Sequence, residues 1–514
     1  MGRPLYLGRV RPAALALSLL VAALPGRAGA AASLGELAGA IASSGIFWAL
    51  ELGWVVFVAL WMLHQRRTPT ATLAWMLGLS AIPLLGIPVY LLVGPRRLER
   101  KKLRMAIARR AVGPAVAWWE ERTAAELPFP GQLARLATAL EAWPPETAQE
   151  MRLYAGGDET LDDIVEAVRT ARRHVHCEYY IFEPDRSGTR LRDALVERAR
   201  AGVKVRLLVD AVGSARLGRP FLEPLLRAGG RVARFNRPLL GRALRGLANF
   251  RTHRKIVVVD GCVGFTGGVN VSDDQSRAAR GEAAWRDTHL RLEGAAVHGL
   301  QATFLENWTF ATRGRDPLRG EALQACFPAA GRGRHWVQVV ASGPDQGTHA
   351  IEALLFAAVA GARERLWITT PYFVPNEALA AALESAALRG VDVRLLLPVR
   401  TDSFVVDAAG RTYHDALADA GVKIHLYGPP MVHAKTLVVD HDLAIVGTAN
   451  LDNRSLRLNF EVVAAVHGEP LAAELARHFE ADLARARPRT GRERDDPLRR
   501  RLLASAARLL SPLL

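Results

Sequence analysis

Cysteine is scarce in this sequence, and acidic residues are fewer than basic ones. The 514 residues include three cysteines, Cys177, Cys262 and Cys326. They are odd in number and lack metal-binding or redox spacing, which favours small core residues over a zinc or redox motif. The 51 Asp and Glu residues do not balance the 67 Lys and Arg residues, and the formal net charge is +16. This excess suits an anionic partner, either a membrane surface or a nucleic acid.

Long apolar runs are confined to the first hundred residues, where two of them reach membrane-spanning length. The run at 46–63 is interrupted only by Glu51, and the run at 73–93 carries no charge. A bilayer-spanning helix needs about 20 apolar residues, and the tryptophans and the tyrosine of these runs suit the membrane interface. The sequence therefore predicts a transmembrane hairpin with a tight turn at 64–72. The hairpin and the basic stretch after it form an expected segment at 41–112.

Charges around the hairpin predict its orientation. Six basic residues lie between positions 96 and 104, and the positive-inside rule places them, and the chain after them, in the cytoplasm. Arg66 and Arg67, in the turn, oppose this orientation. The apolar extension at 1–40 is a cleaved signal peptide, a start-site extension or an extra membrane segment, and cleavage would invert the topology.

Beyond about residue 112 the apolar runs shorten to strand length and alternate with helical stretches rich in Ala, Leu and Arg. This pattern predicts an α/β fold. Strands are expected at 174–182, 203–209, 366–374 and 391–397, and helices at 191–201 and 377–388. The phrase AGVKVRLL at 201–208 nearly recurs as RGVDVRLL at 389–396, so the repeat concerns the fold itself. We expect two similar lobes, at 113–330 and 331–514, joined at a Gly/Pro/Arg-rich seam around 329–334.

One reactive motif occurs in both lobes in strict register. The repeated residues are His253, Lys255, Asp260 and Asn270 in the first copy and His433, Lys435, Asp440 and Asn450 in the second. Every offset is 180 residues (433−253, 435−255, 440−260 and 450−270). The His and Lys lie two apart next to a short apolar strand and share one face, whereas each Asp ends its strand. We take the His, Lys and Asp of both copies as candidate catalytic residues.

Two imidazoles and two ammonium groups in one pocket suit phosphodiester chemistry. The lysines, together with Asn270, Asn450 and Thr448, are expected to bind the non-bridging oxygens. One neutral imidazole attacks phosphorus, and the other protonates the leaving group and then deprotonates the incoming hydroxyl. Asp287 and Glu461 follow the histidines of their own copies by 34 and 28 residues (287−253 and 461−433), and either could hold an imidazole in place. Neither repeat has a second ligand at metal spacing, so we expect no metal and no cofactor.

The chain resembles the phospholipase D superfamily, whose HxKxxxxD motif it carries twice, and within it the bacterial cardiolipin synthases. The resemblance extends from about residue 45 to the end. Phrases that carry it are RRTP at 66–69, EYYIF at 178–182, WRDT at 285–288, TPYFVP at 370–375, NLDNRS at 450–455, LNFE at 458–461 and SPLL at 511–514. Thr252 replaces the usual Asn, Gly268 stands where the second copy has Thr448, and the first 40 residues have no counterpart.

The resemblance implies two phospholipase D-type α/β lobes that share one site on a pseudo-twofold axis, behind the transmembrane hairpin. It also implies the reaction, in which two phosphatidylglycerol molecules give cardiolipin and glycerol, with His253 as nucleophile and His433 as acid and then base. The expected partners are phosphatidylglycerol and anionic lipids rather than nucleic acid. The expected location is the bacterial inner membrane, with a multi-pass anchor and cytoplasmic lobes.

Other interpretations stay open at the level of sequence. A hydrolase of the same superfamily would release phosphatidic acid, a nuclease would use the same motifs, and a membrane scaffold would not need them. The leucine- and arginine-rich stretch at 498–514 is an amphipathic helix, either in the membrane interface or packed on the second lobe. The sequence does not show which histidine is the nucleophile. It also does not show whether phosphatidylethanolamine can replace phosphatidylglycerol as the donor, or what the oligomeric state is.

Overall fold

The computed structural model describes residues 45–64, 72–73, 76–77, 79, 102–114, 131–236, 251–316, 318–331, 333–492 and 495–514. The chain divides into two compact units, Met1–Gly94 and Pro95–Leu514. In the first unit, helix α3 (Gly45–Leu63) covers the first apolar run, and the Trp54 indole donates a hydrogen bond to the Leu79 carbonyl at 3.0 Å. The extension at 1–40 and most of the second run lie outside the described residues. None of the described helices is both long and apolar enough to span a membrane.

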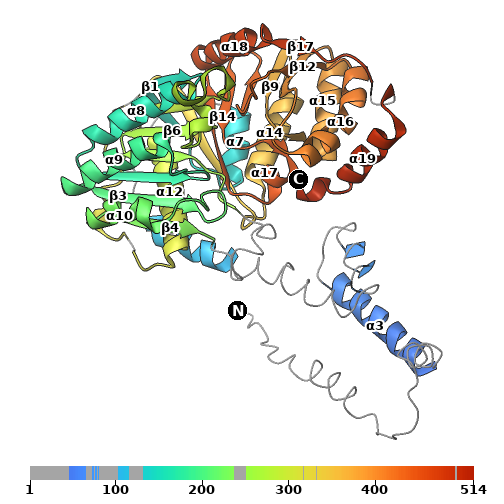
Figure 1. The fold of residues 1–514 in the computed structure, drawn as a ribbon, viewed down its shortest axis with the longest axis horizontal. Coiled ribbons are helices and arrows are strands. Elements are labelled where there is room, and N and C mark those ends of the chain that lie inside the picture. Colours follow the sequence, from blue (N-terminus) through green and yellow to red (C-terminus); the bar gives the residue numbers. More distant parts are fainter. Residues whose placement is uncertain are drawn as a thin grey trace, which may run out of the picture. The chain divides into compact units, whose positions relative to one another are not determined.

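One sheet of fifteen strands runs through the second unit, in the order β17-β12-β11-β9-β13-β14-β16-β8-β1-β7-β6-β5-β2-β3-β4 (Figure 1). The first-lobe strands are β1 (Glu146–Tyr154), β2 (His174–Tyr179), β3 (Lys204–Asp210), β4 (Arg231–Phe235), β5 (Ile256–Val259), β6 (Val263–Gly267) and β7 (His289–Gly294). Those of the second lobe are β8 (His335–Ser342), β9 (Arg365–Thr369), β11 (Asp392–Pro398), β12 (Lys423–Tyr427), β13 (Thr436–Val439), β14 (Leu443–Gly447), β16 (Glu461–His467) and β17 (Ala486–Pro488). A separate two-stranded sheet pairs β10 (Phe373–Val374) with β15 (Leu451–Asp452).

The strand order is mirrored about the centre of the sheet, where β1 and β8 pair antiparallel. Outward from β1 the order is β7, β6, β5, β2, β3, β4, and outward from β8 it is β16, β14, β13, β9, β11, β12. Corresponding strands also follow the same sequence order in each lobe. The predicted two-lobe α/β fold is therefore confirmed, and the lobes are joined by strand pairing.

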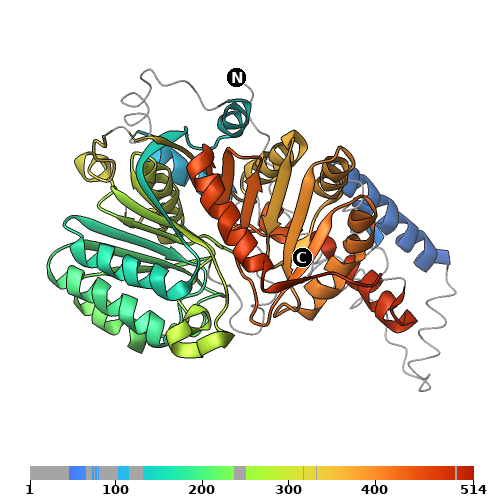
Figure 2. The same ribbon diagram turned by 90° about the horizontal axis from the view of Figure 1, so that it is seen from above.

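Helices lie on both faces of the sheet (Figure 2). The long ones are α8 (Gly157–Thr170), α9 (Arg186–Arg200), α10 (Arg219–Arg227), α12 (Val297–Thr312), α14 (Ala350–Gly361), α15 (Glu377–Leu388), α16 (Phe404–Asp419), α18 (Glu469–Leu483) and α19 (Leu498–Arg508). Strand β5 shows why its sequence is apolar throughout. Ile256 and Val258 pack in a core shared by both lobes, whereas Val257 and Val259 pack on the other face in the first-lobe core. Because both faces are covered, no polar alternation is needed.

Three details differ from the sequence-based expectations. The strand expected at 366–374 is split into β9 and β10, with Pro371, which lacks a backbone N–H for a ladder bond, between them. Helix α7 (Gln132–Ala139) falls in the range expected for the first lobe, but its Ala137 belongs to the second-lobe core. Cys177 and Cys326 are buried as predicted, whereas Cys262 is exposed because it lies in the turn between β5 and β6.

Candidate active site

Each motif histidine is tied by its backbone to the other lobe. The His253 N–H donates to the Phe460 carbonyl at 2.8 Å, and the His433 N–H donates to the Arg286 carbonyl at 2.6 Å. Parallel bridges join Thr252 to Phe460 and Arg286 to Val432. The segment that precedes β5 therefore lies beside the segment that precedes β16, and the segment before β13 lies beside that before β7. This arrangement brings both motifs to one place.

The orienting carboxylates are exchanged between the lobes. Nδ1 of His253 lies 3.0 Å from Oε2 of Glu461, and Nδ1 of His433 lies 2.7 Å from Oδ2 of Asp287. Both carboxylates are fully buried. Sequence numbering relates each acid to the histidine of its own copy, but the backbone bridges place it against the other histidine. With Nδ1 held by a carboxylate, Nε2 is the nitrogen of each ring that is left for chemistry. Nε2 of His433 also lies 3.1 Å from Nζ of Lys435.

Burial lowers the pKa values of the two motif histidines and the two motif lysines, and neighbouring positive charge adds to the effect. Burial lowers the pKa of His253, and burial together with the Lys435 charge lowers the pKa of His433 to about 4. Burial, then the charge of Lys435, lowers the pKa of Lys255 to about 7, and burial lowers the pKa of Lys435 to about 8. Two buried ammonium groups within electrostatic reach of each other are stabilised by an anion placed between them.

The two acids respond in the opposite direction to their surroundings. Burial alone would raise the pKa of Asp287, but the charge and hydrogen bond of His433 bring it below its usual value. Glu461 has a lowered pKa for the same reasons, with His253 as its main partner. Both acids are therefore charged at neutral pH and stabilise a proton on the imidazole that they hold.

The amide and hydroxyl residues divide into two roles. Oδ1 of Asn270 accepts from the Ile181 N–H at 3.3 Å, and Oδ1 of Asn450 is buried with no hydrogen-bond partner among the described residues. Thr448, expected to bind phosphate, instead donates its hydroxyl to Glu461 at 2.5 Å and accepts from the Val462 N–H at 3.0 Å. Both hydroxyl contacts are internal, so Thr448 holds the carboxylate. Oδ1 of Asn450 can only accept and therefore suits a substrate hydroxyl, whereas a phosphate oxygen would need Nδ2 of Asn450 as the donor.

Gly268 is the counterpart of Thr448 but contributes to the site in a different way. A Cβ atom at this position would lie 1.9 Å from Oδ1 of Asp287. The backbone makes the same hydrogen bond at both positions. The Gly268 N–H donates to the Thr288 carbonyl and the Thr448 N–H donates to the Val462 carbonyl, each at 2.9 Å. In one lobe this position leaves room for the acid, and in the other its hydroxyl bonds to the acid.

The structure does not bring Asp260 and Asp440 to the histidines. The Asp260 carboxylate accepts the backbone N–H groups of residues 172, 173 and 174 at 2.7, 2.7 and 2.8 Å. Asp440 accepts those of residues 363, 364 and 365 in the same way. The strand between lysine and aspartate separates the two ends by roughly 16 Å at about 3.3 Å per residue. These aspartates therefore hold the turns that lead into β2 and β9, and among the described residues neither carboxylate contacts a motif histidine.

Sequence reasoning missed several side chains that complete the site. Gln275 donates to Asp287 at 2.5 Å and accepts from the Asn270 N–H at 2.6 Å. The Tyr180 ring lies 4.9 Å from that of His253, and the Trp285 ring lies 5.3 Å from that of His433. Gln275 has no counterpart in the repeat, so periodicity could not identify it. Tyr180 and Trp285 belong to the phrases EYYIF and WRDT, which carried the family resemblance. The phrases did not indicate that these two rings lie against the motif histidines.

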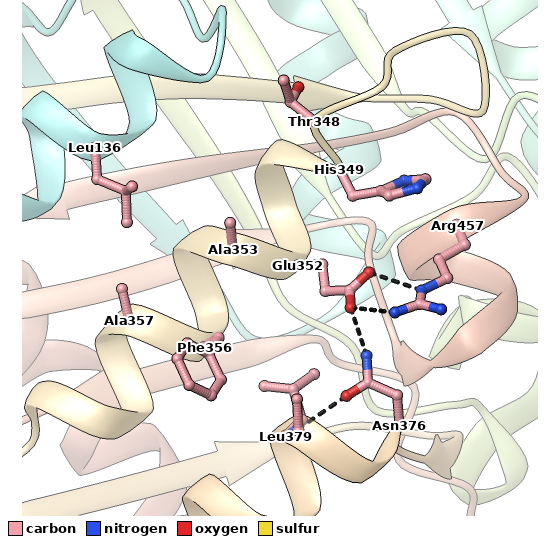
Figure 3. A pocket seen from close by; sticks show the side chains of 11 residues that line it. Leu136, Thr348, His349, Glu352, Ala353, Phe356, Ala357, Asn376, Leu379 and Arg457 are labelled. Carbon is pink, nitrogen blue, oxygen red and sulfur yellow. Dashed lines mark hydrogen bonds and ion pairs between the residues drawn. The ribbon is translucent and has the colours of Figure 1, made fainter. Parts of the chain in front are cut away.

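Two other features lie apart from this site. A cavity of about 490 Å³ lies on the second lobe, and none of the predicted site residues lines it. Among its lining residues, Glu352 accepts hydrogen bonds from Arg457 and Asn376 (Figure 3). His174, His176 and Cys326 are buried together in the first lobe. Nη1 of Arg206 lies 3.4 Å from Nε2 of His176, so this cluster already has a cationic neighbour, which disfavours a metal ion.

Comparison with known proteins first defines the class. A family model described as "Cardiolipin synthase, PLD-like domain" matches residues 164–308 and 355–483, and one described as "Phospholipase_D-nuclease N-terminal" matches 53–95. The crystal structure of phosphatidylserine synthase from Haemophilus influenzae Rd KW20 shares the fold, with a TM-score of 0.56 at 14% identity over 75% of this chain and 100% of that one. The fold is therefore phospholipase D-like.

Sequence relatives narrow the class to one family. Cardiolipin synthase 2 of Bacillus anthracis is 40% identical over 91% of this chain and 90% of its own length. Cardiolipin synthase of Geobacillus kaustophilus is 38% identical over 91% of this chain and 94% of its own length. The chain belongs to the cardiolipin synthase family.

Proposed function

We propose that this protein is a phosphatidyltransferase that converts two phosphatidylglycerol molecules into cardiolipin and glycerol. The observation that carries the proposal is the single buried site in which two histidines, each held by a carboxylate of the other lobe, face two buried lysines. Membership of the cardiolipin synthase family supports the same reaction.

The first half-reaction transfers the phosphatidyl group to the protein. Nε2 of neutral His253 attacks phosphorus, the bond from phosphorus to the glycerol oxygen breaks, and His433 gives its Nε2 proton to that oxygen. The phosphodiester charge raises the pKa of the nearby imidazoles, so that one of them holds a proton when substrate is bound. Glycerol leaves, and a phosphatidyl-histidine remains.

The second half-reaction repeats these steps in reverse with a new alcohol. A glycerol hydroxyl of the second phosphatidylglycerol gives its proton to His433 and attacks phosphorus, and the bond from phosphorus to His253 breaks. Lys255, Lys435 and the two asparagines bind the non-bridging oxygens, whose charge grows in both transition states. A phosphoenzyme whose label maps to His433 would reverse the roles of the two histidines.

We also propose that residues 46–63 and 73–93 anchor the protein as a hairpin in the bacterial inner membrane, with the catalytic unit in the cytoplasm. Support comes from the length and purity of the two runs, from the basic residues at 96–104 and from the family match at 53–95. A thiol reagent that does not cross membranes should fail to label Cys262 in intact spheroplasts and should label it after lysis.

The reaction is tested with purified full-length protein and labelled phosphatidylglycerol in chelator. Cardiolipin with equimolar glycerol would establish transfer between lipids. Phosphatidic acid alone would make the protein a hydrolase. Absence of any lipid product, together with cleavage of a nucleic acid substrate, would overturn the proposal in favour of a nuclease.

A further inference from the structure

Helix α19 packs on the second lobe through its small residues. Ala504 and Ala507 are buried, and Ala507 belongs to a cluster with Ala408 and Ala409 of α16. The Arg508 guanidinium lies 4.8 Å from the centre of the Tyr413 ring, also on α16. The C-terminal end of α19 is therefore fixed beside the first turns of α16, and it is the alanine face that makes the contact.

The opposite face of α19 presents leucines to the outside. Leu502 is 61% exposed and Leu509 is 82% exposed, and Leu498, Leu503 and Leu510 are exposed as well. At about 100° per residue, positions 498, 502 and 509 fall within roughly 40° of one another, on the side away from 504 and 507. By the same count Leu503 and Leu510 lie about 100° further round, nearer the buried alanines, so the exposed leucines form a broad band rather than one row. An exposed apolar band marks a surface that another apolar phase covers.

The charges on α19 indicate which apolar phase covers the leucines. Arg499, Arg500, Arg501 and Arg508 are exposed, and the sequence from 498 to 514 contains no acidic residue. A short helix that combines exposed leucines with arginines suits the interface of a bilayer rich in anionic lipid, where apolar side chains enter the acyl boundary and cations meet phosphates.

Both ends of this region connect to the active site. At the start of α16, Phe404 is 69% exposed, and two residues earlier Asp402 accepts a hydrogen bond from the Tyr372 hydroxyl at 2.5 Å. Asp402 also contributes to the charge felt by Lys435. After α19, the Ser511 carbonyl accepts from Asn453 at 3.0 Å, on the short helix that follows Asn450. Figure 1 shows α19 beside α16, with the chain ending next to α17 (Asn453–Arg457).

We propose that the exposed leucines of α19 and Phe404 form a docking surface that rests in the interface of an anionic bilayer and presents a lipid headgroup to the active site. This α16–α19 surface consists of Phe404, Val405, Leu498, Leu502, Leu503, Leu509 and Leu510. The proposal deepens the proposed function, since it rests on an anionic lipid being the substrate. It adds a second contact with the membrane, made by the catalytic unit itself.

The first test measures membrane depth and does not depend on activity. Cys262→Ser removes the exposed cysteine, Leu502→Cys carries an environment-sensitive dye, and the full-length protein is reconstituted in phosphatidylglycerol vesicles. The dye should shift to shorter wavelength and be quenched by lipids that carry a quencher on the acyl chain. A matched control is Leu388→Cys in the same background, because Leu388 is 73% exposed at the far end of α15. Equal quenching at both positions, or none at 502, would overturn the proposal.

The second test separates docking from chemistry. Leu502→Glu combined with Leu509→Glu should lower turnover of phosphatidylglycerol in vesicles about tenfold, because carboxylates are repelled from an anionic interface. Turnover of a short-chain phosphatidylglycerol in monomeric solution should stay unchanged, as should both activities of Leu388→Glu. A loss on both substrates would contradict docking. Quenching at 502 in a protein that makes no cardiolipin would retain the surface and reject the proposed reaction.

Discussion

Residue 268 and its counterpart 448 each lie next to an acid that contacts a motif histidine. Gly268 leaves the space in which the carboxylate lies, and its counterpart Thr448 uses a hydroxyl to hold Glu461. The repeat therefore preserves the acid–histidine pair by two different means. At this scale the sequence predicted the histidines, lysines and both acids. It did not predict Gln275 or the exchange of acids between lobes, because neither leaves a periodic signal.

Gly268→Ala should lower kcat by about 10²-fold, since a displaced acid misplaces the imidazole. The backbone at 268 does not have a positive φ, but the added Cβ overpacks a buried site, so the free energy of unfolding should also fall, by about 1–3 kcal/mol. The measurement is steady-state turnover alongside thermal unfolding. Gly347→Ala is the control, with nothing within 4 Å of its added Cβ. Full activity of Gly268→Ala would show that Asp287 is not needed where it lies.

Replacing either acid by its amide tests the exchanged pairs. Asp287→Asn and Glu461→Gln should each lower kcat by about 10²-fold or more, because the amide no longer stabilises a protonated imidazole or fixes its tautomer. Each change should also move the pH–rate profile, which loss of packing alone would not do. Thr448→Ser, which keeps the hydroxyl that holds Glu461, should retain activity. An amide variant with the original turnover and pH profile would remove the orienting role.

Strands β5 and β13 act as rigid spacers at the scale of elements. Each carries the reactive pair just before its start and an aspartate after its end, and the aspartate holds the turn that leads into the neighbouring strand. The motif spacing thus combines chemistry and architecture. The strand between the two ends was predicted correctly from the sequence, but a spacing that repeats within the chain does not reveal that the two ends have different roles.

Asp260→Asn should mainly weaken folding. Asp260 has φ of 54°, which Asn tolerates, so the change removes charge-assisted hydrogen bonds without new strain. We expect a loss of about 1–3 kcal/mol in the free energy of unfolding and near-normal turnover of the folded protein. Denaturant unfolding followed beside activity measures both. A large fall in kcat with unchanged stability would return Asp260 to the catalytic residues.

Contacts of two arginines join the lobes of the second unit. Arg254 is buried and donates to the Glu461 carbonyl at 3.0 Å, to Asn307 at 2.9 Å and to the Ser342 carbonyl at 3.2 Å. Arg286 pairs with Asp482 at 2.8 Å. The repeat predicted two lobes, whereas the continuous sheet and these buried arginines depend on long-range packing that single-sequence patterns do not encode.

The buried lysines predict opposite pH trends for binding and stability. The pKa values of about 7 for Lys255 and about 8 for Lys435 mean that both lose their charge as pH rises through that range in the empty site. KM for phosphatidylglycerol should therefore rise between pH 7 and 9. The unfolded chain keeps these protons up to its ordinary lysine pKa and so binds more of them, and the empty protein should become more stable over the same window. A KM independent of pH, with no gain in stability, would contradict this.

The exchange of carboxylates has a consequence for ancestry. In a single lobe with this fold, the histidine would have no acid from its own lobe beside it. A half-length chain could therefore assemble a working centre only as a twofold dimer. Duplication and fusion of such a gene would make the dimer permanent. The two copies could then diverge in sequence, so that one could keep a glycine where the other acquired a threonine.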